Sequence, residues 1–396
     1  MQKKLLGLAV AGALAAPGLA LAQVEVYGFV NMSVGKVKYS SDTAGNPSVS
    51  KWDVMSHASN YGIRGRENVG GGQTAWFQIE QNAPMERSNN VAITPASRNS
   101  AVGLQGAWGN AFMGQWTTPW ADLDALWGVG TVGGLGPITS LIGRRETTGT
   151  APNPNCANGH TSPAVGICDA VEAGGGVGHA FWRRASQAVF YQSPVFAGVQ
   201  VKLMYQTNEG KSTVAVPGTV VQADPSMWSG SVQWAGMGGR LRVGAAVDAH
   251  KDFTTPGQTD NGFRVTGGWN FGFADLGAAY EQMTYKGATG DVDAMQWGVA
   301  LAIPVGQGAI RGSFSQADDL EVAGVATPTG AKQWNLGYDY RFSKRTTVGV
   351  GYATIDNDTG ARFTWSGLSS AQNGQDVTPP AGSDVDIFFV HMIHRF

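Results

Sequence analysis

The feature that most constrains the fold of this chain is a strict alternation of apolar and polar residues, clearest at 332–342. In the segment KQWNLGYDYRF, one set of alternate positions holds Trp, Leu, Tyr, Tyr and Phe, and the other holds Gln, Asn, Gly, Asp and Arg. Successive side chains of a β-strand point to opposite faces, so the segment predicts a strand with one apolar and one polar face. The apolar face of such a strand packs into the core of a soluble sandwich or faces lipid around a membrane barrel.

The same period of two recurs along most of the chain, and helical periodicity is nearly absent. The sequence therefore predicts an all-β fold. We place sixteen strands near 24–38, 53–67, 72–82, 98–106, 110–117, 182–193, 197–207, 227–236, 239–250, 261–272, 274–286, 292–303, 308–317, 332–342, 345–356 and 384–396.

The connections between these strands alternate in length. Tight turns fall at 67–72, 106–111, 235–240 and 341–346, and long polar loops fall at 40–51, 83–97, 208–225 and 357–383. Short turns at one rim and long loops at the other are typical of an outer-membrane barrel. Sixteen strands would bring both chain ends to the same rim and leave an aqueous lumen.

Composition helps to decide which side of each strand meets lipid. The mean hydropathy of −0.13 excludes a polytopic helical membrane protein, because each helical span needs about 20 apolar residues. In a barrel whose strands alternate apolar and polar residues, the two kinds cancel in the mean hydropathy, so a low value does not exclude contact with lipid. Aromatic residues on the apolar faces also lie near short turns, which suits a girdle at the headgroup boundary. They are Trp234, Phe271, Phe273, Tyr340 and Phe342. We therefore interpret the chain as a transmembrane antiparallel β-barrel with lipid outside and water inside.

The first 22 residues have the pattern of a secretory signal peptide. Lys3 and Lys4 precede an apolar run from 5 to 16, and Ala-Leu-Ala at 20–22 forms a small-residue cleavage site. The mature barrel domain would span 23–396, with a formal charge of 25 − 29 = −4. This slightly negative net charge argues against a nucleic-acid partner.

The other end of the chain, DVDIFFVHMIHRF, is a strand-like run that stops on Phe396. Chain ends of soluble domains usually fray rather than end on an apolar strand. A barrel, in contrast, needs a complete last strand to close against its first. We expect Phe396 to be part of the C-terminal signal for barrel assembly.

The longest connection, 118–181, carries the candidate chemistry. Loops of this length are usually functional or disordered. It opens with Asp122 and Asp124 among Trp and Leu residues, which predicts apolar anchoring to the wall with both carboxylates toward the passage. Cys156 and Cys168 lie late in the loop, and export to an oxidising compartment predicts a disulfide between them. Their neighbours fit no standard metal site, and we expect no metal and no cofactor.

Several motifs resemble those of the Gram-negative general porins, over essentially the whole mature chain. They are VYGFVNMSVG near the mature start, SNYGIRGRENVGGGQTAWFQIE, SRNSAVGLQGAWGNAFMGQWTTPW, YQSPVFAGVQVKLMYQ and the terminal HRF. The branch that they resemble is the trimeric porins of neisserial and other beta-proteobacterial type. The resemblance implies a 16-stranded barrel in the cell outer membrane, surrounded by lipid and lipopolysaccharide, assembled as a homotrimer and narrowed by an inward-folded third loop.

The resemblance also implies a constriction with opposed charges. Arg98 and Arg184 match positions of the basic cluster on the wall, and Arg64 occupies a basic position in the second strand. Asp122 and Asp124 would face them from the loop. By strand parity, nine arginines line the wall against five acids, which predicts a mild anion preference that the loop acids reduce. The arginines are Arg64, Arg66, Arg98, Arg184, Arg240, Arg242, Arg264, Arg311 and Arg341, and the acids are Glu80, Asp248, Asp275, Glu281 and Asp339.

The expected function is passive diffusion of ions and small hydrophilic solutes through a water-filled channel. The alternative is a solute-specific outer-membrane channel, for example for anionic solutes. An enzyme is not expected, because the six histidines suggest no nucleophile with a histidine partner.

Overall fold

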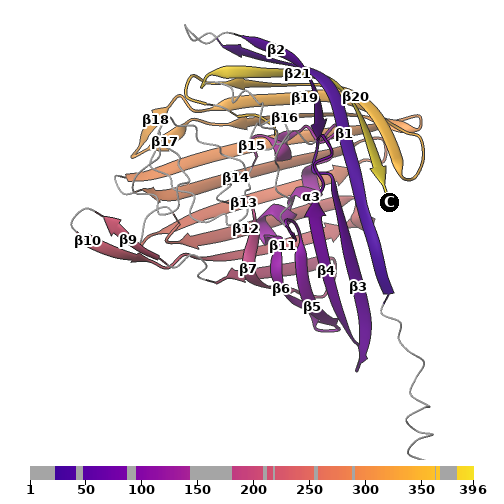
Figure 1. The fold of residues 1–396 in the computed structure, drawn as a ribbon, viewed down its shortest axis with the longest axis vertical. Coiled ribbons are helices and arrows are strands. Elements are labelled where there is room, and N and C mark those ends of the chain that lie inside the picture. Colours follow the sequence, from indigo (N-terminus) through magenta and orange to yellow (C-terminus); the bar gives the residue numbers. More distant parts are fainter. Residues whose placement is uncertain are drawn as a thin grey trace, which may run out of the picture.

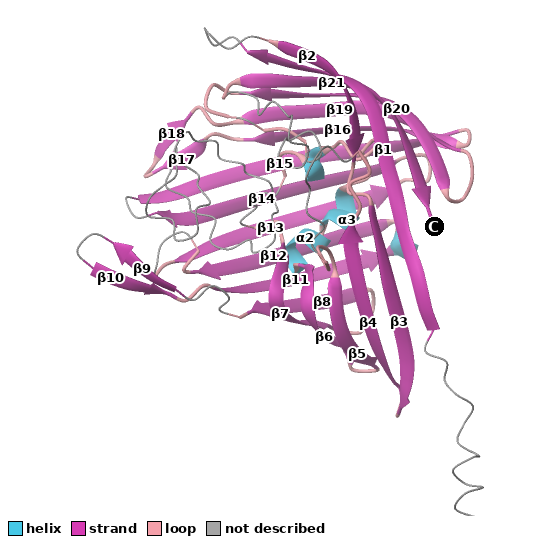
Figure 2. Cartoon of the chain, in the orientation of Figure 1, coloured by secondary structure: helices cyan, strands magenta, loops and turns pink. Residues whose placement is uncertain are grey.

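The structure is a computed structural model, and Figure 2 shows that it consists mainly of strands. It describes residues 23–41, 48–86, 95–142, 181–207, 212–216, 219–253, 257–287, 290–361, 363–365 and 381–396. The expected signal peptide and both cysteines lie outside the described residues. In the described part of the chain, no helix is long and apolar enough to cross a membrane.

Long antiparallel strands build the wall of the molecule (Figure 1). In chain order the strands are β1 (Gln23–Ser41), β2 (Val49–Ser56), β3 (Asn60–Gly70), β4 (Gln73–Asn82), β5 (Ser100–Gly106), β6 (Gly109–Thr117), β7 (Arg184–Gln192), β8 (Val199–Gln206), β9 (Ser212–Val216), β10 (Thr219–Ala223), β11 (Ser226–Gly236), β12 (Leu241–Lys251), β13 (Thr259–Asn270), β14 (Asp275–Gly287), β15 (Gly290–Val305), β16 (Gly308–Ala317), β17 (Leu320–Val322), β18 (Val325–Thr327), β19 (Ala331–Arg341), β20 (Thr346–Asn357) and β21 (Ser383–Arg395). The helical pieces are α2 (Pro119–Asp122), α3 (Asp124–Trp127) and the 3₁₀ turns η1 (Pro137–Thr139) and η2 (Met237–Gly239).

The wall closes on itself. Apart from two loop hairpins and a break in the second crossing, the strands pair in chain order around the wall, and β21 pairs with β1 over the register Phe29↔Arg395 to Ser41↔Ser383. The hairpins β9–β10 and β17–β18 belong to loops, because β9 and β10 form a separate sheet and β17 touches only the end of β15. β2 and β3 pair with successive halves of β1 and together form one crossing. Of the 21 strands this leaves 21 − 4 − 1 = 16 crossings, so the predicted sixteen-stranded barrel is confirmed.

Two details of the strands differ from the prediction. The second crossing is interrupted at 57–59, because Ala58 takes a left-handed φ of 54° that breaks the extended backbone. Arg98 lies just before β5 rather than within it. Its backbone N–H still donates to the carbonyl of Glu80 at 3.1 Å, so the segment continues alongside β4.

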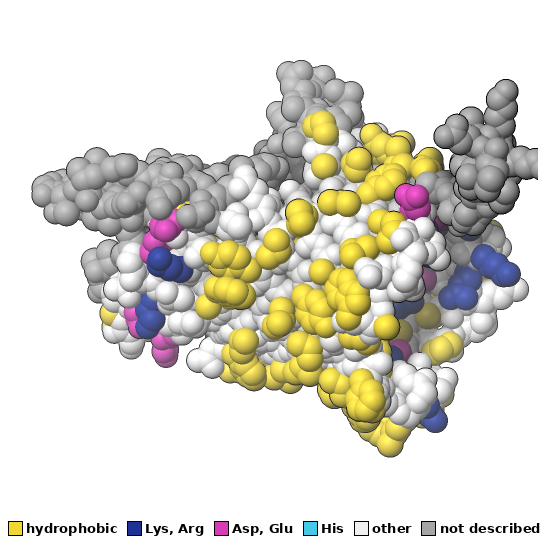
Figure 3. Space-filling model, turned by 90° about the horizontal axis from the view of Figure 1, so that it is seen from below, with side chains coloured by type: hydrophobic (Ala, Val, Ile, Leu, Met, Phe, Trp, Pro, Cys, Tyr) yellow, Lys and Arg dark blue, Asp and Glu magenta, His cyan; other side chains and the backbone are white. Residues whose placement is uncertain are grey.

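The two faces of the strands are inverted relative to a soluble protein. In β19, Trp334 and Leu336 are 41% and 55% exposed, whereas Gln333 and Asn335 are 0% and 2% exposed. Figure 3 shows apolar side chains spread over the strand-covered outer surface, with charged side chains toward its margins. An apolar exterior around a polar interior is the arrangement that a barrel in lipid requires. The prediction that the apolar faces point outward is therefore confirmed.

Candidate pore-lining site

The first part of the long connection, residues 119–142, lies against the polar inner face of the wall (Figure 1). It begins with a capped turn, in which the Thr118 hydroxyl accepts a hydrogen bond from the Ala121 N–H at 3.3 Å and Pro119 occupies the first helical position. From there the segment crosses the inner face from β11 to β21 and β1.

Wall side chains hold this segment through its backbone carbonyls. Polar residues on five strands donate hydrogen bonds to six carbonyl groups spread between residues 120 and 133. The pairs are Arg264 to Trp120 (3.0 Å), Thr266 to Leu123 (3.4 Å), Arg242 to Leu126 (3.2 Å), Arg311 to Val129, Asn335 to Gly130 (2.8 Å) and Asn31 to Gly133 (3.1 Å). Because the donors come from β13, β12, β16, β19 and β1, the segment is fixed along a wide arc of the wall.

Apolar side chains of the segment fill gaps in the same wall. Trp120 and Leu123 pack with Met283 and other residues of the barrel, and Trp127 packs with small alanines of β14 and β15. Further along, Val132 and Leu135 join a large buried cluster with Phe389 and neighbouring residues of β1, β2, β20 and β21. The expected apolar anchoring of this loop is present in the residues that the structure describes.

At one point the segment and the wall touch so closely that only glycine fits. A Cβ atom on Gly277 of β14 would lie 2.0 Å from the carbonyl oxygen of Trp127. The backbone of α3 therefore rests directly on the backbone of β14. An alanine at this position would push the segment away from the wall.

The two loop carboxylates pair with cations on the wall. Asp122 accepts a hydrogen bond from the Lys202 ammonium of β8 at 3.1 Å. Asp124 pairs with the guanidinium of Arg264 on β13 and accepts a hydrogen bond from the Trp182 indole at 2.5 Å. Burial raises the pKa of Asp122, and the charges of Lys202 and Arg184 act in the opposite direction.

Arg264 is the most buried cation on the part of the wall that residues 119–142 cover. It is fully buried, and its second acidic neighbour is Glu281 of β14, whose side chain is also fully buried, at 3.4 Å. The nearby wall arginines are also paired. Arg242 contacts Asp275 at 2.6 Å, and Arg311 contacts Asp339 at 3.0 Å.

The three arginines that the resemblance to porins implies for the constriction lie across the lumen from the wall that residues 119–142 cover. Arg98 donates to Glu80 at 2.7 Å, and its side chain is 15% exposed. Arg184, at the start of β7, donates to the Asn99 side chain at 2.9 Å. Arg64 on β3 pairs with Glu25 at 2.9 Å and also lies over the Tyr27 ring, 4.7 Å from its centroid.

The structure thus brings the predicted residues together only in part. Arg184 is near enough to Asp122 to influence its protonation, but the direct partners of the two loop acids are Lys202 and Arg264. Strand parity identified Arg264 as a wall residue, whereas Lys202 was overlooked, although its place between the apolar Val201 and Leu203 gave the signal. Phe396 closes the barrel, because its N–H donates to the Gly28 carbonyl at 3.0 Å.

A closed barrel with an apolar exterior, a charged interior and an inner segment fixed to its wall defines a channel-forming outer-membrane protein. The sequence matches the family of Gram-negative porins over residues 7–360. The chain belongs to this family, which confirms the resemblance, and it forms a channel in the outer membrane.

Individual proteins are similar to this chain in sequence or in fold. The chain is 26% identical over 368 residues to outer membrane porin protein 32 of Delftia acidovorans, covering 90% of each protein. Its fold is similar to that of the anion-selective porin from Comamonas acidovorans, with a TM-score of 0.66, 22% identity and coverage of 95% of this chain and 100% of the other. It is also similar to the trimer form of OmpT of Vibrio cholerae, with a TM-score of 0.57, 14% identity and coverage of 95% and 99%.

Proposed function

We propose that ions and small hydrophilic solutes diffuse passively through a passage bounded by residues 119–142 on one side and by the inner faces of β3–β8 on the other. The observation that carries this proposal is the arc of carbonyl contacts. In the described part of the chain, residues 119–133 form no hydrogen bond with β3–β6, and they reach β8 through the Asp122–Lys202 ion pair at the border of the passage. The same residues cover the inner wall from β11 round to β1. The open cross-section lies opposite the covered wall.

The charges along this passage support a mild preference for anions. Among the described residues that are not buried, the cations at the inner face on this side are Arg64, Arg66, Arg98, Arg184 and Lys202, of which Arg98 and Arg184 are placed by their bonds to Glu80 and Asn99. The acids are Glu25, Glu80 and, from the segment, Asp122. The difference is 5 − 3 = +2. Charged residues that line a channel set its ion preference.

The similarity to a porin described as anion-selective also supports a preference for anions. The similarity to a trimer form of a related barrel supports a homotrimer for this chain. In our proposal each barrel carries its own passage, residues 1–22 are removed on export, and the outer surface meets lipid and lipopolysaccharide. We expect no catalytic role for the wall residues.

In our proposal the whole connection 118–181 is the constriction loop, of which residues 143–180 lie outside the described part of the chain. A disulfide between Cys156 and Cys168 would close a short subloop, which stabilises by about 3 kcal/mol in an unstrained case. We expect it to stiffen the loop near the mouth. Single-channel conductance and gating that do not change with a reducing agent would contradict this role.

The decisive experiment is the reversal potential of the purified protein in planar bilayers under a KCl gradient. We expect conductance steps with a potential shifted toward chloride selectivity. The double variant Arg98→Ala with Arg184→Ala should shift this potential toward cations, because it removes two positive charges beside the passage. Lys344→Ala with Arg345→Ala is the matched control, since both cations are exposed in the turn between β19 and β20 and hold no part of the segment. An unchanged potential in the double variant would show that Arg98 and Arg184 do not line the passage.

A further inference from the structure

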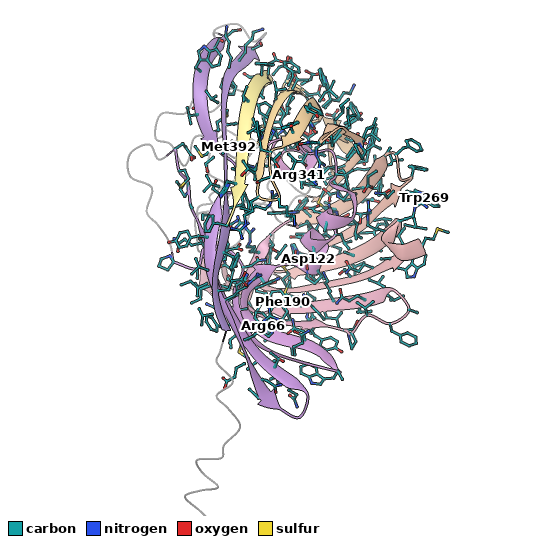
Figure 4. The ribbon with its side chains drawn as sticks, turned by 90° about the vertical axis from the view of Figure 1, so that its right-hand side faces the viewer. Arg66, Asp122, Phe190, Trp269, Arg341 and Met392 are labelled. Atoms are coloured by element: carbon teal, nitrogen blue, oxygen red, sulfur yellow. The ribbon has the colours of Figure 1, made fainter. Side chains whose placement is uncertain are left out.

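The open wall carries three aromatic residues in one row of inward-facing positions, where a water-filled channel would be expected to be polar. Each residue of the row lies directly opposite the next one on the neighbouring strand. It consists of Arg66 on β3, Trp76 on β4, Gly103 on β5, Phe112 on β6, Phe190 on β7 and Met204 on β8. Arg66 and Phe190 are labelled in Figure 4. Directly opposed side chains share one face of a sheet, so the whole row lies on the inner face of the wall, where Phe112, Phe190 and Met204 are buried and Trp76 is half-buried.

Trp76 is held in one position within this row. A Cβ atom on Gly103 would lie 2.6 Å from the indole, so the ring packs directly against this glycine. The indole N–H donates to the Asn110 side chain at 2.8 Å. The indole is inclined by 58° to Phe112 and by 71° to Trp116, with ring centroids 5.3 Å and 5.8 Å away. Trp76 therefore presents a fixed, partly exposed aromatic face to the lumen.

A cavity of about 500 Å³ adjoins this ring. It is lined by Trp76 together with polar residues of the neighbouring strands, among them Arg66 and Gln78, and by the glycines of two short turns. Such a volume is in the range of small-molecule sites. The turn glycines, Gly72 and Gly106, place the cavity near the short-turn mouth of the barrel.

The two arginines of the cavity differ in what they can offer a ligand. Arg64 is engaged with Glu25 and with the Tyr27 ring. Arg66 is exposed and forms no ion pair with the residues that the structure describes. It stands directly opposite Trp76, and directly opposed Cβ atoms are about 4.5–5.5 Å apart. A guanidinium is thus available next to a fixed indole.

We propose that this cavity binds small planar aromatic carboxylates on their way through the channel. The ring of the solute would stack on Trp76, and its carboxylate would take two hydrogen bonds from the Arg66 guanidinium, whose planar shape suits that geometry. A cationic solute finds no unpaired acid here, because Glu25 already holds Arg64. This inference rests on the proposed passage along β3–β8 and gives that passage a preferred class of solute.

The test uses benzoate as the probe on single channels in planar bilayers. We expect benzoate to reduce the KCl conductance in a saturable way. Cyclohexanecarboxylate, which has the same charge but no aromatic face, should need a several-fold higher concentration. Trp76→Leu should raise the half-saturating benzoate concentration by about tenfold, through the loss of ring stacking. The matched control is Trp228→Leu, because Trp228 is 60% exposed on the outer surface.

A second pair of variants tests the charge. Arg66→Gln should also raise the half-saturating concentration by about tenfold, and because Arg66 is exposed its replacement does not endanger folding. Arg341→Gln, another exposed arginine next to a short turn, is the control and should leave benzoate binding unchanged. Equal effects of Arg66→Gln and Arg341→Gln, or equal binding of the two carboxylates, would overturn the proposed site.

The result also separates this inference from the proposed function. Normal KCl conductance with no effect of benzoate would refute the aromatic site and leave the passage intact. A protein without conductance steps in KCl would refute the passage, and the site with it.

Discussion

Arginines occur on both sides of the inner wall, but their surroundings differ. On β12, β13 and β16, Arg242, Arg264 and Arg311 lie under residues 119–142 and each contacts both an acid and a backbone carbonyl of that segment. On β3, Arg64 and Arg66 are exposed to the lumen. The first group holds a piece of chain against the wall, whereas the second group faces the passage.

This difference shows why a count of wall arginines is a poor measure of ion selectivity. A cation that is paired with an acid and covered by protein contributes no net charge to the solution beside it. Only charges along the uncovered part of the wall act on a passing ion. The paired arginines contribute instead to the position of the segment, and through it to the width of the passage.

Replacing a covered arginine should therefore produce the largest change in stability. In Arg264→Gln, Glu281 loses its positive partner while it stays fully buried. Removing one partner of a buried ion pair costs about 3–5 kcal/mol. The measurement is denaturant unfolding in detergent, followed by tryptophan fluorescence.

The matched variant is Arg66→Gln, which replaces an exposed arginine of the open wall. Exposed substitutions usually change the free energy of unfolding by less than about 0.5 kcal/mol. If the Arg264 and Arg66 variants were equally stable, the distinction between anchoring and passage arginines would be wrong.

A smaller effect is expected from crowding the contact between the segment and the wall. In Gly277→Ala, the new methyl group would overlap the Trp127 carbonyl and push α3 toward the open side. Overpacking of this kind costs about 1–3 kcal/mol. We expect a lower single-channel conductance, because the displaced segment narrows the passage.

Gly267→Ala on β13 is the control, because its Cβ atom would meet no other atom closer than 3.4 Å. A conductance that rises in Gly277→Ala, or falls equally in both variants, would show that the segment does not border the passage as proposed.

The alternation of residues was sufficient to predict the barrel, because the period of two both defines a strand and assigns its two faces. In 332–342 every apolar residue was placed outward, and Trp334 and Leu336 are indeed exposed beside buried Gln333 and Asn335. The break at Ala58 could not be predicted in this way, since a left-handed φ at an alanine leaves no mark in the pattern.

The partners in each ion pair could not be predicted from the sequence. Parity places Arg264 and Glu281 on inner faces, but only the register Arg264↔Glu281 between β13 and β14 makes them neighbours. The partners of Asp122 and Asp124 depend on the path of a loop, which no strand period describes. The aromatic row from Trp76 to Phe190 also emerges only when the registers of β4–β7 are combined.

The smallest effect that we expect concerns the one acid of the segment that lies beside the passage. Because burial raises the pKa of Asp122, this carboxylate should take up a proton at a higher pH than an ordinary aspartate. Its protonation removes one negative charge, so acidification should strengthen the anion preference. The measurement is the reversal potential in a KCl gradient as the pH is lowered from neutral.

Asp122→Asn identifies the source of this pH dependence. The variant should show the stronger anion preference already at neutral pH, and its response to mild acidification should be reduced. Asp124→Asn is the comparison, because Asp124 is paired with the fully buried Arg264 on the covered wall and should contribute less to the potential. If the two variants shift the reversal potential equally, the negative charge of Asp122 does not act on the passage, and the boundary between the covered and open walls must lie elsewhere.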